Sequence, residues 1–125
     1  MHQRFLLSAA LAAFLAVGLG AFAAHGLRGQ LDENLMEVFQ TGVRYHFFHA
    51  LGLALIAMLV KQYPDSKLLC WSGWLMLAGI VVFSGSLYLL TLSGLTWLGM
   101  ITPFGGLAFL AAWLLLAGFA YRDAV

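Results

Sequence analysis

Three histidines are the side chains of this chain most able to do chemistry. His25 follows the first long apolar segment, and His46 and His49 open the second. His46 and His49 are three residues apart, so they lie on one face of a helix. With His25 they could offer three imidazoles to a metal ion, although no cysteine or carboxylate lies beside them in the apolar segments. This spacing alone is a weak indication of a metal site.

Hydroxyl side chains extend the polar set into the later apolar segments. Polar groups within a membrane segment are functional hypotheses by default. Three interpretations stay open: a metal or haem site, a pocket that donates hydrogen bonds to a lipid headgroup or a quinone, and a structural network bonded to itself and to the backbone. The candidate ligand-binding residues are His25, His46, His49, Ser84, Ser86, Tyr88 and Thr102, of which the three histidines are the metal candidates.

Composition indicates that membrane helices must position these residues. The 125 residues are 63% hydrophobic and 9% charged, whereas a soluble domain carries about 25% charged residues. We therefore expect membrane lipids to surround most side chains. With a net charge of only +1, the chain is not expected to have the basic surface that binds nucleic acid. The single cysteine, Cys70, excludes a disulfide within the chain.

Four apolar runs predict four transmembrane helices, at about 5–24, 43–60, 68–92 and 97–121, in one domain covering 1–125. About 20 residues cross a hydrocarbon core of about 30 Å. Strands are not expected, because the runs do not alternate with period two. The first run exceeds the 7–15 residues of a signal-peptide core, so we expect it to be a span. The predicted fold is an all-α membrane protein, a four-transmembrane-helix antiparallel bundle.

The polar stretch between the first two spans has helical periodicity. Its apolar side chains share one face, which predicts a short interfacial amphipathic helix over about 32–41, with Asp32 as its cap. The chain would then turn at Thr41-Gly42 into the second span. A single unbroken helix is the alternative. Glu37 and Arg44 lie on one face, as expected for a solvated charge pair.

The antiparallel arrangement brings the polar set to one leaflet. His25 would end the first span while His46 and His49 occupy the first turns of the second, and the hydroxyl residues would lie near the same end of the later spans. Lys and Arg set the orientation. One side would hold Arg4, Lys61, Lys67 and Arg122 and the other Arg28 and Arg44, so both termini are expected in the cytoplasm and the polar set in the outer leaflet.

Small residues and local irregularities predict how the helices pack. The first span has a small residue at every fourth position: Ser8, Ala12, Ala16, Gly20 and Ala24. Such a row favours close helix contact, either within the chain or between subunits. In the third span, the serines of Ser84-Gly85-Ser86 could bond to the preceding turn or to a neighbouring helix. Pro103 is expected in the first turn of the fourth helix, with Thr102 as its cap. The alternative is a helix that begins near Trp97 and is kinked at Pro103.

Four motifs in order resemble the YgdD/YwdK family of small bacterial inner-membrane proteins. They are the residues 20–27 (GAFAAHGL), 39–46 (FQTGVRYH) with His49-Ala50-Leu51, 83–88 (FSGSLY), and Leu98-Gly99 with 101–106 (ITPFGG). The family is grouped as a domain of unknown function and has a eukaryotic transmembrane relative. The resemblance covers nearly the whole chain and implies a four-span, multi-pass inner-membrane protein. It implies no catalytic residues.

Two functions follow as hypotheses. The first is a non-enzymatic accessory subunit or small oligomeric membrane protein, in a homo-oligomer or a larger membrane complex, whose polar cluster organises the bundle. The alternative is a binder of a lipid, quinone or metal at the outer leaflet. A pore is weaker, since no span carries a continuous polar stripe. No phosphate-binding loop, dinucleotide fingerprint or nucleophile–base arrangement is present in the sequence, so hydrolytic chemistry is not expected.

Overall fold

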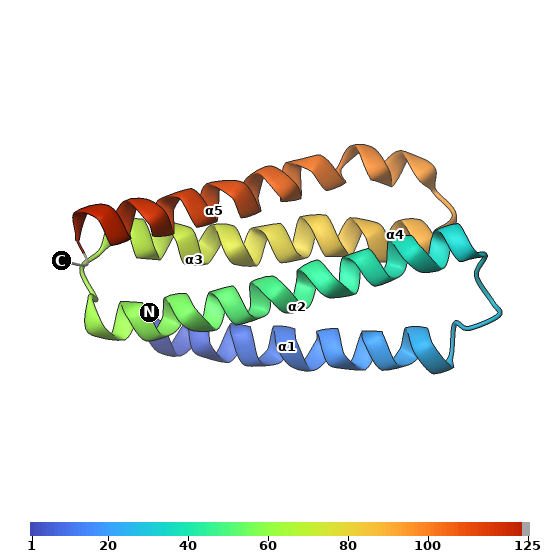
Figure 1. Cartoon of the computed structure of the whole chain (residues 1–125), viewed down its shortest axis with the longest axis horizontal. Helices are drawn as coiled ribbons and strands as arrows, with labels where there is room; N and C mark the ends of the chain where they lie inside the picture. The colour runs from blue at the N-terminus through green and yellow to red at the C-terminus, as the bar shows by residue number, and fades with distance from the viewer. Residues whose placement is uncertain (124–125) are drawn as a thin grey trace.

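The computed structural model describes residues 1–123 as an antiparallel bundle of four long helical rods (Figure 1). The first two rods are α1 (His2–His25) and α2 (Glu33–Gln62). The third consists of α3 (Lys67–Gly79), the π-helical turn η1 (Ile80–Ser84) and α4 (Gly85–Ser93). After the 3₁₀ turn η2 (Thr96–Met100), α5 (Thr102–Arg122) forms the fourth. Each rod is long and apolar enough to cross a membrane, which confirms the four predicted spans.

The predicted interfacial helix is wrong as a separate element, because α2 is one unbroken helix. Asp32 caps it as expected, with its carboxylate accepting a hydrogen bond from the Leu35 amide at 2.8 Å. The helix then continues through Thr41-Gly42 without a turn. Gly42 costs helix propensity, but it lets the Tyr88 ring of α4 pack against the α2 backbone, where a Cβ would lie 3.0 Å from Cε1. Tertiary packing therefore overrides the local break signal.

The fourth span was predicted over about 97–121. The favoured position of Pro103, in the first turn of its helix, agrees with the structure, whereas the predicted Thr102 cap is wrong. α5 begins at Thr102 with Pro103 in its first turn, and the preceding residues form the short turn η2. Proline is tolerated there because the first amides of a helix lack intrahelical partners. The Thr102 hydroxyl does not cap the helix. It bonds instead to Ser86 of α4, at an oxygen–oxygen distance of 2.5 Å.

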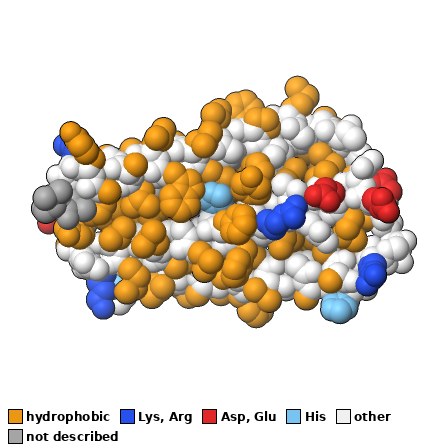
Figure 2. Space-filling model, viewed as in Figure 1, with side chains coloured by type: hydrophobic (Ala, Val, Ile, Leu, Met, Phe, Trp, Pro, Cys, Tyr) orange, Lys and Arg blue, Asp and Glu red, His pale blue; other side chains and the backbone are white. Residues whose placement is uncertain are grey.

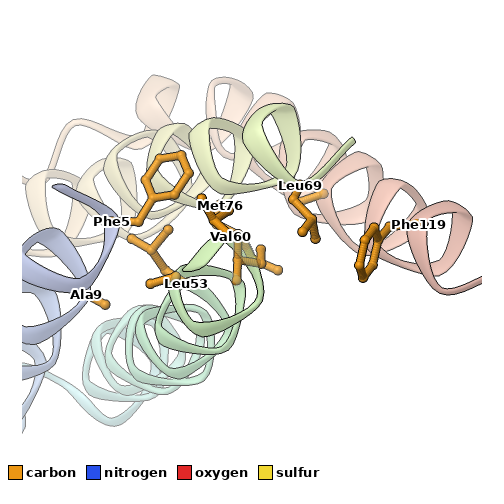
Figure 3. Close-up of a cluster of buried hydrophobic side chains, with 10 residues drawn as sticks. Phe5, Ala9, Leu53, Val60, Leu69, Met76 and Phe119 are labelled. Carbon is orange, nitrogen blue, oxygen red and sulfur yellow. The ribbon is translucent and has the colours of Figure 1, made fainter. Parts of the chain in front are cut away.

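The central rod, α3–η1–α4, holds the bundle together. In Figure 1 it runs between α2 and α5, and both pack on it. A large apolar cluster at the end of the bundle that carries the termini takes residues from all four rods, including Phe5, Leu53, Met76 and Phe119 (Figure 3). Smaller clusters continue toward the other end. Hydrophobic side chains occupy much of the outer surface, and charged groups lie mostly toward the two ends of the bundle, as expected in lipid (Figure 2).

The small-residue row of α1 packs inside the chain. Ala12 and Ala16 are buried, and a Cβ added at Gly20 would lie 3.3 Å from Val43 of α2. Leu11 on the opposite face is 54% exposed. The close contact predicted for this row is therefore made with α2, as expected of helices that associate through small residues in lipid.

Candidate functional site

His46 joins α2 to α4 through a side-chain hydrogen bond. Its Nδ1 lies 2.9 Å from the Tyr88 hydroxyl, and the ring is buried. The Tyr88 ring reaches this position by passing over Gly42, one turn earlier on α2. The α1 backbone at Ala12 lies beside the imidazole. His46 is thus enclosed by three helices.

His49 uses both of its ring nitrogens. Nδ1 lies 2.7 Å from the Tyr45 carbonyl oxygen, and the indole N–H of Trp113 on α5 donates to Nε2 at 3.1 Å. A carbonyl only accepts and an indole N–H only donates, so the proton must be on Nδ1 and the lone pair on Nε2. The ring also stacks on Phe109, with centroids 3.5 Å apart and planes 11° from parallel. His49 is held as one neutral tautomer.

The hydroxyl groups connect the central rod to its neighbours. Ser84 donates to the Gly42 carbonyl of α2 at 2.7 Å, and Ser86 bonds both to the Phe83 carbonyl of the preceding turn and to Thr102 of α5. Both expected kinds of serine bond are therefore present. Ser84 ends the π-helical turn η1, and such single π-helical turns inside helices are frequent at functional sites.

The structure does not bring His25 to the other two histidines. His25 is exposed at the end of α1, whereas Ala12, which contacts His46, lies in the middle of that helix. They are 13 positions apart, which corresponds to roughly 20 Å along the helix. Among residues 1–123, no three histidine, cysteine or carboxylate side chains are grouped to hold a metal ion. The three histidines therefore form no shared metal centre.

The expected depth of the histidines in the bundle is also corrected. Because α2 starts at Glu33, His49 lies about 24 Å from one end of the helix and about 20 Å from the other, at roughly 1.5 Å per residue. Its partner Trp113 is likewise near the middle of α5. The polar contacts thus extend from one end toward the centre of the bundle. Figure 2 shows a histidine at the centre of a mostly hydrophobic face.

Ser72 and Trp113 each form a hydrogen bond to another helix, and neither bond was predicted from the sequence. Ser72 donates to the Ala112 carbonyl of α5 at 2.7 Å and is fully buried. Trp113 lies in the middle of its span, unlike Trp71, Trp74 and Trp97 near helix ends. An indole N–H within hydrocarbon needs an acceptor, so the mid-span position of Trp113 was the sequence feature that could have predicted its hydrogen bond. Glu37 and Arg44 form the expected exposed ion pair, at 3.5 Å.

A cavity of about 600 Å³ lies beside His49, between α2 and α5. Tyr45 and His49 form one wall, Phe109 and Trp113 form the other, and Phe83 of η1 lies at its base. Every fully buried side-chain nitrogen and oxygen within the described residues has a hydrogen-bond partner. The polar groups therefore cross-link helices, while the cavity is lined mainly by aromatic and aliphatic surface.

Four apolar spans and an internally bonded polar core define a multi-pass α-helical membrane protein. Residues 19–106 match the family model described as "Protein of unknown function (DUF423)", and the chain belongs to this family. It is 48% identical to the UPF0382 membrane protein YwdK of Bacillus subtilis, over 90% of this chain and 91% of that protein. It is 46% identical to the UPF0382 membrane protein SH2409 of Staphylococcus haemolyticus, over 90% of each chain. No solved structure matches the chain.

Proposed function

We propose that the protein is a non-enzymatic membrane scaffold, acting as an accessory subunit or small oligomer, whose polar residues hold the bundle in one arrangement. The observation that carries this proposal is the complete pairing of the buried polar side-chain atoms in residues 1–123. A binding or catalytic site normally keeps a donor or acceptor directed at its ligand. Here the fully buried groups bond to neighbouring helices or to the backbone of their own helix.

The strength of the network is consistent with a structural role. Five side-chain hydrogen bonds join different rods: His46–Tyr88, His49–Trp113, Ser72–Ala112, Ser84–Gly42 and Ser86–Thr102. Interhelical hydrogen bonds in membranes average about 0.6 kcal/mol each. Five of that size supply about 3 kcal/mol, a sizeable part of the roughly 5–15 kcal/mol that stabilises a folded protein.

Serine-to-alanine variants test the scaffold directly. Ser72→Ala and Ser84→Ala each remove a bond between rods, so each should lower the free energy of unfolding in mixed micelles by about 0.5–1.5 kcal/mol. Ser93→Ala is the matched control, because the exposed Ser93 hydroxyl bonds only to Leu89 of its own helix and the neighbouring Leu95 amide. Equal stability of all three variants would contradict a structural role for the network.

We also propose that the protein resides in the bacterial inner membrane with both termini in the cytoplasm. Both termini lie at the same end of the bundle (Figure 1), the end that also carries Lys61 and Lys67. The excess of Lys and Arg at that end supports a cytoplasmic location. Compartment reporters fused to the C-terminus and inserted in the 26–32 loop should give opposite results, with the C-terminal reporter cytoplasmic. A periplasmic C-terminal reporter would reverse the orientation.

The scaffold proposal includes a partner, either a second copy or a larger membrane complex. It is supported by α1 and α5, whose outer faces carry large exposed apolar side chains such as Phe14 and Phe104. Gentle extraction followed by native mass spectrometry should show a species heavier than the 13.6 kDa chain. A monomer under all mild detergents would contradict the oligomeric form of the proposal.

A further inference from the structure

The cavity between α2 and α5 is lined by His49, and this imidazole has no free N–H to donate to a ligand. His49 already donates from Nδ1 to Tyr45 and accepts at Nε2 from Trp113, whose only N–H is thereby used. The remaining lining is mainly ring faces and aliphatic groups, among them Phe83, Phe109 and Leu110, and Tyr45 is its one hydroxyl-bearing side chain. Such a surface favours an apolar occupant over a quinone ring or a headgroup that must be hydrogen-bonded.

The cavity extends from Pro103, in the first turn of α5, to Trp113 near the middle of that helix, and this range of depth points to the same kind of occupant. Trp113 lies about 16 Å from the start of α5 and about 14 Å from its end. Headgroups lie at the surfaces of a hydrocarbon core about 30 Å thick, so about 15 Å separates them from this level. The part of a phospholipid that reaches the level of Trp113 is its acyl chain.

The size of the cavity argues against a helix from a second copy. A helix with its side chains is roughly 10–12 Å across and rises 5.4 Å per turn, so a volume of about 600 Å³ holds on the order of one turn. A membrane-crossing partner presents about 20 residues, or more than five turns. A single flexible chain can enter a space that a helix cannot.

Two adjacent glycines show how the space is formed. A Cβ at Gly105 would lie 2.4 Å from the Phe83 backbone nitrogen, so α5 presses directly on the π-helical turn at that residue. A Cβ at Gly106 would have nothing nearer than the Phe83 ring at 3.9 Å. Gly105 therefore brings α5 close to η1, while the absence of a side chain at Gly106 leaves the cavity open above the Phe83 ring.

We propose that this cavity binds one acyl chain of a membrane phospholipid, held against the rings of Phe83, Phe109 and Trp113. This site goes beyond the scaffold role and does not depend on it. The bound chain would cover aromatic surface that remains open beside the contacts of His49 with Phe109 and Trp113, where α2 meets α5.

Photolabelling with a phospholipid that carries a diazirine at mid-chain tests the proposal. The protein is reconstituted in phosphatidylglycerol–phosphatidylethanolamine vesicles containing this lipid, illuminated, and mapped by peptide mass spectrometry. Labelling at Phe109 and Trp113 should exceed labelling at Leu114, although Leu114 is 73% exposed and Trp113 only 40%. A specific site holds its chain longer than the surrounding lipid does.

Gly106→Leu fills the cavity, and Gly18→Leu is its matched control. A Cβ at Gly18 meets nothing within 4 Å, and that residue is on the exposed face of α1. Gly106→Leu should abolish the excess labelling of Trp113 and leave Leu114 unchanged, while Gly18→Leu changes neither. Equal labelling of Trp113 and Leu114 in the unmodified protein, or excess labelling that survives Gly106→Leu, would overturn the proposal. So would excess labelling by a photoactivatable isoprenoid quinone that displaces the phospholipid probe.

Discussion

Replacing the two adjacent glycines of α5 by alanine should have opposite effects on stability. Gly105→Ala places a Cβ 2.4 Å from the backbone nitrogen and 2.7 Å from the Cα of Phe83. Non-bonded carbon atoms rest at about 3.5–4.0 Å, so α5 and η1 must separate by about 1 Å. The obstacle is backbone rather than the end of a flexible side chain, so a rotamer change cannot relieve it.

The magnitude follows from two opposing terms. Either substitution gains about 0.5–1 kcal/mol, because alanine loses less backbone freedom than glycine in a helix. Forcing an extra carbon into a packed contact costs about 1–3 kcal/mol. The Cβ of Gly106→Ala would lie 3.9–4.0 Å from the Phe83 ring and close to nothing else. This variant therefore has the favourable backbone term without the cost of overpacking. We expect Gly105→Ala to destabilise the protein and Gly106→Ala to be neutral or stabilising, with a difference of roughly 1–3 kcal/mol.

Unfolding in mixed micelles, followed by far-ultraviolet circular dichroism or tryptophan fluorescence, measures this difference. The two variants have the same composition and nearly the same position, so membrane insertion and detergent binding are matched between them. Equal free energies of unfolding, or the reverse order, would show that α5 does not contact the π-helical turn at Gly105. Gly105 would then not hold α5 against η1, and the cavity above the Phe83 ring would not be formed in this way.

Two further predictions concern the helix contacts on either side of α2. Ala16→Leu should lower the free energy of unfolding by about 1–3 kcal/mol, since Ala16 is buried against α2. Leu11→Ala, on the lipid-facing side of α1, should leave it within about 0.5 kcal/mol, and comparable losses would place the small-residue row in lipid. Trp113→Phe should cost about 1–3 kcal/mol by leaving Nε2 of His49 unpaired. His49→Phe in that background should restore part of the loss, and a purely additive double-mutant cycle would show that the bond is not formed.

The number and order of the spans could be predicted from the sequence because the bilayer allows few alternatives. Apolar length sets the helices, and lipid leaves the backbone no other way to bond. The end of the predicted interfacial helix at Gly42 was wrong for a local reason. A glycine that interrupts an isolated amphipathic pattern also admits the Tyr88 ring, and only the tertiary contact decides between these roles.

The membership of the polar site could be predicted only in part. His46, Ser84, Ser86, Tyr88 and Thr102 do form contacts between rods, as their types and positions suggested. His25 was included because it was expected to face histidines in the first turns of the second span. The longer α2 moves those histidines toward the centre of the bundle and away from His25. Because the second helix was predicted to start too late, His46 and His49 were placed too close to the membrane surface. The metal site that they were predicted to share with His25 does not form for this reason.

The central rod explains why stability and lipid binding can be separated in this protein. Ser72 and Ser86 tie the rod to α5, while Ser84 and Tyr88 tie it to α2. Among residues 1–123, the one side-chain hydrogen bond that joins α2 directly to α5 is His49–Trp113, at the edge of the cavity.

The positions of α2 and α5 thus depend on the serine bonds of the rod, whereas the space between them depends on Gly106 and the Phe83 ring. The serine variants should therefore lower the free energy of unfolding while the acyl chain still binds in the cavity. Gly106→Leu should exclude the acyl chain from the cavity without breaking any hydrogen bond to the central rod. Because each set of variants acts on one property, the scaffold proposal and the lipid proposal can be disproved independently.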